Sequence, residues 1–429
     1  MISIVLVASF LLIPLIFNAV IPASYQSIST QLYGSDVESK TVAIENGNNI
    51  QRDISYDLGN CGKNGQCISY DHSKKSIVIS CGSVHLTDIA NQINEQDVIK
   101  KESDENWLLN ASIIIEKGTT LILDPQDTKW LKILAYGNVA YGIHIYGSLV
   151  IDSIKLTSWN PSTNNYAQSY GSRETSGKIT HPGAPRPFIR IESGSTGTAN
   201  ITNSEIAYLG YEGGWGSGTS GIHYHNGGDG SIIKNNKIHN LYFGFYSNSV
   251  SGMLIESNLF YNNGHYGIDP HTGTHDMIIR NNTVYGNNGT AIICSLDCYN
   301  ILIENNKVYN NTGYGITFSR NMTNSVVRNN FIHNQMRAIF VSASHNNQVY
   351  NNTIFNTDDG ISLTNGASKN KIHDNRIINS INALRFNAGS HNNIVYSNNI
   401  VNATQHMIKY DDQNTKDNNN NSSTQNRNT

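Results

Sequence analysis

Residues 281–295 read NNTVYGNNGTAIICS, and residues 305–319 read NNKVYNNTGYGITFS. Both copies hold an Asn pair, a short apolar strand, a polar turn and a second strand, and such copies recur at roughly 23 residues from about residue 221 onward. A unit of this length has room for two or three short strands, and it buries its apolar side only when other units stack on it. The repeat therefore predicts an all-β fold, a right-handed parallel β-helix with coils of about 23 residues.

The many Asn residues are explained by the same stacking. In adjacent coils their amides can hydrogen-bond along the axis, and Asn tolerates the left-handed backbone that tight turns require. Neither glycosylation nor ligand binding is inferred from their number.

Period-two alternation assigns the faces of the second strand in each coil. Its second and fourth positions, such as Ile268 in one coil and Phe318 in another, are expected to face the core. Its third and fifth positions are expected to face solvent. In three neighbouring coils, about 4.8 Å apart, these outward positions bring together His223, His225, Tyr246, Asn248, Asp269 and His271.

Three interpretations of this cluster differ in chemistry. The first is a solvated surface without a task. The second is a metal site, because His223 and His225 are two apart on one strand, with Asp269 and His271 beside them. The third is proton transfer on a sugar polymer that lies along this face, since Tyr, His and carboxylate are the residues that general acid–base chemistry uses.

The segment YGIDPH, Tyr266 to His271, resembles the YG-[IF]-DPH signature of mannuronan C5-epimerases. The segments WLLNASIIIEKGTTLIL, RPFIRIESGSTGTANITNSEIAYLGY, YFGFYS and AIICS are also similar to coils of the bacterial periplasmic alginate epimerases. The resemblance spans about Trp107 to Tyr410, but the specific motif is confined to one coil. The NN-x-[IV] repeats alone are shared with unrelated β-helices.

This resemblance implies an enzyme that removes the C5 proton of a uronic acid within an acidic polysaccharide and returns a proton to the opposite face. By motif, His271 is one acid–base group, Tyr266 is the other, and Asp269 orients His271 or contacts the sugar. Substrate binding is assigned to the remaining outward residues, His223, His225, Tyr246 and Asn248. A uronate lyase, which begins with the same proton abstraction, and a non-catalytic carbohydrate-binding or surface β-helix protein are the alternatives.

Two departures from the family pattern bear on this assignment. Thr272 follows the DPH motif where the relatives have Asp. Leu296 stands where they carry an Arg that neutralises the substrate carboxylate, and this change favours the non-catalytic alternative. Arg320, one coil further on in GITFSR, is expected to occupy the equivalent column and to act in its place. A divalent cation such as calcium is another substitute, although no cofactor and no metal ligands are assigned.

Composition narrows the partners and the location. Charged residues make up 14% of the chain and the net charge is −3, so there is no basic stripe for nucleic acid. The apolar run at residues 2–17 predicts a signal peptide or a membrane anchor within residues 1–24. The protein is therefore expected to be secreted or to reside in the cell envelope.

Three further segments are expected after residue 24. These are a Cys-containing cap at residues 25–105, the β-helix at residues 106–412 and a disordered polar tail at residues 413–429. The spacing in CGKNGQC suits a disulfide-closed loop between Cys61 and Cys67, with Cys81 or the pair Cys294 and Cys298 completing the set. A zinc site is the alternative use of these cysteines.

Overall fold

The computed structural model describes residues 67–411, except for residues 104, 169–171, 174–178, 181–184, 214–217 and 388, and also Thr415 and residues 422–426. The predicted signal or anchor segment at residues 1–24 and the first part of the predicted cap lie outside the described residues. Within the described part, no helix is long and apolar enough to cross a membrane.

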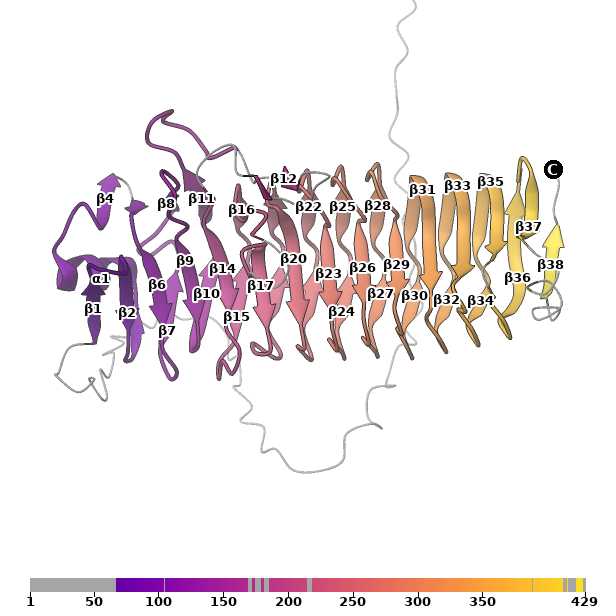
Figure 1. Ribbon diagram of the computed structural model, residues 1–429, viewed down its shortest axis with the longest axis horizontal. Coiled ribbons are helices and arrows are strands. Elements are labelled where there is room, and N and C mark those ends of the chain that lie inside the picture. Colours follow the sequence, from indigo (N-terminus) through magenta and orange to yellow (C-terminus); the bar gives the residue numbers. More distant parts are fainter. Residues whose placement is uncertain are drawn as a thin grey trace, which may run out of the picture. The chain divides into compact units, whose positions relative to one another are not determined.

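Three parallel β-ladders build the described coils, and each coil adds one strand to each ladder (Figure 1). The ladder that carries the candidate site, the site ladder, consists of β2 (Ser76–Ile79), β6 (Ser112–Ile115), β9 (Gly142–Ile145), β14 (Phe188–Ile191), β17 (Gly221–His225), β20 (Phe243–Asn248), β23 (Ile268–His271), β26 (Ile292–Ser295), β29 (Ile316–Ser319), the second halves of β31 (Phe331–Ser342), β33 (Thr353–Thr364) and β35 (Arg376–Phe386), and β37 (His406–Tyr410).

The second ladder follows the site ladder along each coil. It consists of β3 (Ser83–Val84), β7 (Thr120–Leu123), β10 (Ser148–Asp152), β15 (Ala199–Thr202), β18 (Ile232–Lys234), β21 (Leu254–Glu256), β24 (Ile278–Arg280), β27 (Leu302–Glu304), β30 (Val326–Arg328), β32 (Gln348–Tyr350), β34 (Lys371–His373) and the start of β36 (Ile394–Val401).

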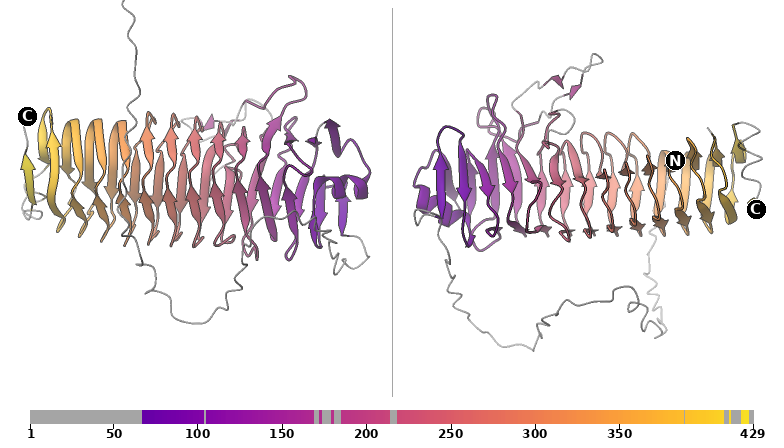
Figure 2. Two further views of the ribbon diagram at one scale, coloured as in Figure 1. Left: turned by 180° about the vertical axis from the view of Figure 1, so that it is seen from behind. Right: turned by 60° about the horizontal axis from the view of Figure 1, so that its bottom comes forward.

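The third ladder closes each coil. It consists of β5 (Asn106–Leu109), β8 (Trp130–Leu134), β11 (Lys155–Trp159), β16 (Glu205–Ala207), β19 (Lys237–His239), β22 (Leu259–Tyr261), β25 (Thr283–Tyr285), β28 (Lys307–Tyr309), the first halves of β31, β33 and β35, and the end of β36. The same coil-by-coil order is visible from behind and from below in Figure 2. The β-helix prediction is confirmed.

The predicted core register is confirmed in the site ladder. Ile268 pairs with Phe245 in the coil before and with Ile292 in the coil after, and all three side chains are buried. Phe318 pairs with Cys294 and Val341, which are also buried. Identical apolar positions therefore stack from coil to coil and form one continuous core.

The two Asn residues of each pair have different structural roles, one in the turn and one in the core. The first Asn of each pair has a positive φ, 57° at Asn281 and 56° at Asn305, as the turn requires. The second Asn is buried, and its side-chain amide donates to the side-chain oxygen of the matching Asn in the next coil. From Nδ2 of Asn282 to Oδ1 of Asn306 the distance is 3.0 Å. Because each buried amide has both donors and acceptor occupied, the stacked Asn side chains tie the coils together without an unpaired polar group.

The cap packs on the first coils. β1 (Ile68–Asp71) is antiparallel to β2, β4 (Ile99–Ser103) is antiparallel to β5, and α1 (Leu86–Ile93) lies between them in sequence. β2 and β3 already pair in parallel with β6 and β7, so parallel stacking begins inside the predicted cap segment at residues 25–105.

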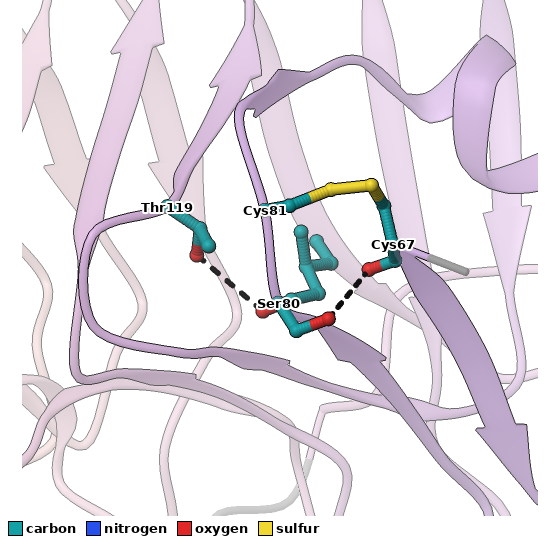
Figure 3. The surroundings of a disulfide bond; sticks show 5 residues. Cys67, Ser80, Cys81 and Thr119 are labelled. Atoms are coloured by element: carbon teal, nitrogen blue, oxygen red, sulfur yellow. Dashed lines mark hydrogen bonds between the residues drawn. A yellow bond between two sulfur atoms is a disulfide. The ribbon is translucent and has the colours of Figure 1, made fainter. Parts of the chain in front are cut away.

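The expected disulfide between Cys61 and Cys67 is wrong. Cys67 is bonded to Cys81 instead, and the carbonyl of Cys67 accepts a hydrogen bond of 3.2 Å from the hydroxyl of Ser80 (Figure 3). The β1–β2 hairpin brings the two ends of this bond together, a proximity that spacing in the sequence does not encode. Cys294 and Cys298 are buried free thiols. Cys61 lies outside the described residues.

The predicted disordered tail at residues 413–429 differs from the structure over five residues. β38 (Ser422–Asn426) pairs in parallel with β36. A polar segment can add to the last coil in this way because strand pairing needs only main-chain groups at an open edge.

Replacing Ile268 with Asp is expected to lower the free energy of unfolding by more than about 4 kcal/mol, because it places an unpaired charge between stacked coils. Ile232→Asp is the matched control, since Ile232 lies on β18 and is 36% exposed; we expect a change of about 0.5 kcal/mol. Denaturant unfolding of both variants measures the difference. Equal stability of the two variants would contradict the inward position of Ile268.

Candidate functional site

The candidate site is assembled from three neighbouring strands of the site ladder. In the third position, His223 of β17 pairs with Tyr246 of β20, which pairs with Asp269 of β23. In the fifth position, His225, Asn248 and His271 pair in the same order. The structure therefore brings together all six outward residues of the predicted cluster.

The expectation that the third position faces solvent is wrong for two members of the cluster. His223 is only 4% exposed and Asp269 only 2% exposed. The large side chain of Tyr246 lies between them in the column, and its ring is 4.6 Å from that of His223. Both ring nitrogens of His223 lack a hydrogen-bond partner among the described residues, and so does Oδ1 of Asp269. Buried polar atoms of this kind are costly and are frequently found where a protein performs chemistry.

His271 is held by two side chains. Its Nδ1 lies 2.6 Å from the hydroxyl of Thr272, and its Nε2 lies 2.9 Å from Nη2 of Arg320. A guanidinium only donates, so Nε2 is the accepting nitrogen and Nδ1 carries the proton. These contacts, and the ring of Tyr246 stacked at 5.6 Å, orient the imidazole. Two roles were expected for Asp269. The first, orientation of His271, is filled by these other side chains among the described residues, and the second, contact with the sugar, stays a prediction.

Arg320 reaches the site from two coils further along. Thr272, Leu296 and Arg320 occupy one column, because the backbone N–H of Thr272 bonds to Ser295 and that of Leu296 bonds to Ser319. Positive φ angles of 66° at Leu296 and 59° at Arg320 mark the same turn in both coils. Nε and Nη2 of Arg320 donate to the hydroxyl of Ser295 over 3.0 and 2.6 Å. The expected column of Arg320 is thus confirmed by the register.

Burial sets the protonation states of the site. Burial, supported by the charge of Arg320, lowers the pKa of His271 to about 4, so the imidazole is neutral at neutral pH and can accept a proton. Burial raises the pKa of Asp269 well above its usual value, despite the opposing charge of Arg320. Burial also raises the pKa of Tyr246 to about 12 and raises that of Tyr266. The two phenols therefore keep their protons at neutral pH.

Tyr266 precedes β23, whereas His271 ends it, so the two residues lie at opposite ends of this short strand. The ring of Tyr266 is fixed by edge contacts with Phe243 at 5.4 Å and His265 at 4.0 Å. Phe243 also stacks on His265 at 4.8 Å. Among the residues that the structure describes, none forms a hydrogen bond with the hydroxyl of Tyr266, so aromatic packing is what holds this phenol in place.

The metal interpretation is poorly supported by the geometry. No group of three or more His, Cys, Asp or Glu side chains in the described part of the chain is arranged to hold a metal ion. The rings of His223 and His225 are 5.9 Å apart, and Asp269 is the one carboxylate of the predicted cluster, whereas calcium takes roughly six to eight oxygen ligands. The residues present do not fit a resident calcium ion.

Sequence reasoning missed the cluster's continuation into the preceding coil. Arg190 of β14 pairs with His223, and its Nε lies 3.0 Å from the carboxylate of Glu192, which also bonds Nδ1 of His144 at 2.7 Å. The signal was present in RPFIRIES, whose alternation places Arg190 at the third position and Glu192 at the fifth. Extending the third-position and fifth-position columns by one coil toward the N-terminus would have included both residues in the cluster.

Fold and site together define a right-handed parallel β-helix with a cluster of His, Tyr and Asp side chains on one ladder. A family model described as a right handed beta helix region matches residues 183–330 and 272–427. The two matches together cover more than half of the chain, and the protein belongs to this family.

Curated relatives are similar over part of their length. The chain is 25% identical over 239 residues to a mannuronan C5-epimerase of Pseudomonas fluorescens, covering 53% of this chain and 42% of the relative. It is 24% identical to the mannuronan C5-epimerase of Pseudomonas aeruginosa, over 47% of this chain and 36% of the relative. The match thus spans less than half the length of either relative.

Solved structures share the fold. A double mutant of the periplasmic alginate epimerase AlgG superposes with a TM-score of 0.67 at 20% identity, over 78% of this chain and 82% of the other. The A-module of the Azotobacter vinelandii mannuronan C-5 epimerase AlgE6 gives a TM-score of 0.56 at 16% identity, over 76% and 88% of the chains. At these identities the likeness is one of fold.

Proposed function

We propose that the protein is a polysaccharide C5-epimerase that acts on a uronic acid polymer, in the manner of mannuronate to guluronate conversion. The observation that carries the proposal is the neutral, doubly anchored imidazole of His271, stacked on the protonated phenol of Tyr246 and in the same coil as that of Tyr266, within the YGIDPH motif. The similarity to mannuronan C5-epimerases supports this reaction class. By the same similarity, we propose an extracytoplasmic location, with residues 2–17 as signal peptide or anchor.

In the proposed reaction, Nε2 of His271 takes the proton from C5 of the uronate. The electron pair of the broken C–H bond moves into the carboxylate and forms an enolate-like intermediate. Tyr266 then delivers its phenolic proton to the opposite face of C5, and the configuration is inverted. Solvent restores the proton of Tyr266 and removes that of His271, so the cycle consumes no co-reactant.

Arg320 has two functions in this proposal. In the free protein its guanidinium bonds to Nε2 of His271 and covers the lone pair of the base. An anionic uronate carboxylate is a stronger acceptor than a neutral imidazole, so bound substrate draws the guanidinium away. The base is then exposed, and Arg320 stabilises the negative charge that develops on the carboxylate. Ser295 keeps the side chain near both positions.

The test is incubation of the protein with polymannuronate and with other polyuronates in deuterated water, followed by NMR. Deuterium at C5 of inverted residues, without unsaturated chain ends, supports epimerisation. Unsaturated ends would identify a lyase. Binding without any exchange at C5, whatever the pH or added cation, would contradict catalysis and leave a carbohydrate-binding β-helix.

Replacing Arg320 with Gln is expected to lower kcat/KM about 10²-fold, since one charge-stabilising donor is lost. It should also move the acidic limb of the pH profile to higher pH. The positive charge of Arg320 disfavours the imidazolium, so its removal raises the pKa of His271 from about 4 toward the ordinary value. The free-enzyme limb in kcat/KM against pH reports this shift.

Arg280→Gln is the control for this change, because Arg280 pairs with Glu256 over 2.7 Å on the second ladder, away from the cluster. It should alter neither kcat/KM nor the acidic limb. An unmoved limb in the Arg320 variant would show that its charge does not act on His271.

A further inference from the structure

A second charged cluster lies toward the C-terminal end of the site ladder, in the coils of β31, β33 and β35. Its centre is Asp359, which is 3% exposed and lies 3.3 Å from Nε of Arg337 and 3.2 Å from Nη1 of Arg385. Asn382 donates to the same carboxylate over 2.8 Å, and Ser362 over 3.2 Å. One buried carboxylate thus fixes two arginines from coils on either side of it.

Both arginines are more rigidly held than an ion pair alone requires. The guanidinium of Arg337 lies over the rings of Tyr314 at 5.1 Å and Phe340 at 4.9 Å, and its Nη1 donates to the hydroxyl of Tyr314 over 3.3 Å. Arg385 also bonds Asp411 over 3.1 Å. Each arginine side chain nevertheless remains 25% exposed. Such an arrangement pre-organises cationic groups at the surface, which lowers the entropy lost on binding.

The cluster lies in the same columns as the candidate site. Phe340, Ser362, Arg385 and Lys409 follow one another in the third position, the column that contains Asp269. The central carboxylate, Asp359, is only 3% exposed, whereas the side chains of Arg337 and Arg385 are each 25% exposed and Lys409 follows Arg385 in the same column, so the accessible end groups above this carboxylate are cationic. An anionic ligand is therefore favoured over a cationic one.

Small side chains connect the two clusters. The fifth position, which His271 occupies in β23, holds Ser295, Ser319 and Ser342 in the next three coils. Arg337 and Phe340 lie three coils beyond His271 and Arg385 lies five coils beyond it, or about 14 and 24 Å at the usual strand spacing. A linked pyranose residue is about as long as one coil is thick, so successive sugars of a polymer keep step with the coils.

We propose that Arg337 and Arg385 form a distal subsite that binds the carboxylates of a uronate polymer several residues away from the sugar at His271. The subsite rests on the proposed function for its ligand class, but it concerns binding and not proton transfer. Because roughly six sugars are needed to span from His271 to Arg385 at one sugar per coil, the subsite makes affinity depend on chain length. Short oligomers occupy the site at His271 without reaching it.

The test measures binding of a mannuronate trimer and a mannuronate octamer by calorimetry, with the full chain and without reference to turnover. Arg337→Gln and Arg385→Gln should each weaken octamer binding about ten-fold, the usual effect of one charge-assisted hydrogen bond, and leave trimer binding unchanged. Arg328→Gln is the matched control, because Arg328 pairs with Glu304 over 2.7 Å and with the hydroxyl of Tyr350 over 3.0 Å on the second ladder.

Octamer affinity equal to that of the wild type in both variants overturns the subsite. Equal weakening of trimer and octamer also overturns it, because it indicates a general change of fold, which the melting temperature of each variant reports independently. A wild-type protein that binds the octamer no more tightly than the trimer has the same consequence. A length-dependent effect in a protein that exchanges no C5 proton supports the subsite and refutes only the proposed epimerase.

Discussion

His271→Ala is expected to reduce deuterium incorporation at C5 of polymannuronate by about 10²–10⁴-fold, the contribution typical of one general base. The imidazole is the proposed proton acceptor, and its pKa of about 4 keeps it in the accepting form throughout the neutral range. Both exchange and inversion should be lost together, since no carbanion-like intermediate forms. NMR of the recovered polymer measures the two quantities in one experiment.

Stability and binding should change little in this variant. His271 is only partly buried, and its ring contacts Tyr246, Thr272 and Arg320 on the outer side of the ladder. His275→Ala is the matched control, because His275 lies in the next turn, bonds Asp276 and stacks on Tyr299 at 4.5 Å. Full exchange in the His271 variant would remove this residue from the reaction, whatever the fate of the control.

The repeat made the fold and the column positions predictable. Consecutive coils pair residue for residue. Aligning Phe245 with Ile268 was therefore enough to place His271 beside Asn248, and aligning Ile292 with Ile316 brought Arg320 into the column of Leu296. This works because one residue of slippage would turn every apolar side chain of a strand outward. Register in a parallel stack is therefore strongly constrained by the hydrophobic pattern.

Features that depend on side-chain packing were not predictable. Alternation shows that Asp269 points away from the core, but not that its neighbours cover it and raise its pKa. The partner of Nδ1 in His271 is the adjacent Thr272, a rotamer choice that no periodicity reveals. Disulfide pairing failed for the same reason, because Cys81 reaches Cys67 through a hairpin and not through short spacing.

Leu296 stands at the position where the sequence's resemblance to mannuronan C5-epimerases led us to expect an Arg, and in the proposed function Arg320 takes over that role from the next coil. Leu296 and Arg320 adopt the same left-handed turn one coil apart, and the long guanidinium side chain extends back toward His271. Arg320 lies one coil further along than Leu296, but its guanidinium still reaches His271. The bonds of Arg320 to Ser295 and His271 place its guanidinium where the proposed reaction requires it.

Tyr266→Phe is expected to separate the two halves of the reaction. The change removes only the hydroxyl and keeps the ring that packs on Phe243 and His265. Since burial raises the pKa of Tyr266, the phenol holds its proton until the intermediate forms and then acts as the acid. Without it, inversion should fall by about 10²–10⁴-fold, while His271 still removes the C5 proton and returns a solvent deuteron to the same face.

The expected signature is therefore deuterium at C5 of residues that have kept the original configuration. Tyr246→Phe tests the second phenol of the site, and Tyr285→Phe, within the stacked rings of the third ladder, is the control for loss of a hydroxyl. If inversion is lost in the Tyr246 variant and retained in the Tyr266 variant, the acid is Tyr246. If exchange and inversion fall equally in the Tyr266 variant, the hydroxyl acts before C5 loses its proton. That result would contradict the assignment of His271 as the base and Tyr266 as the acid.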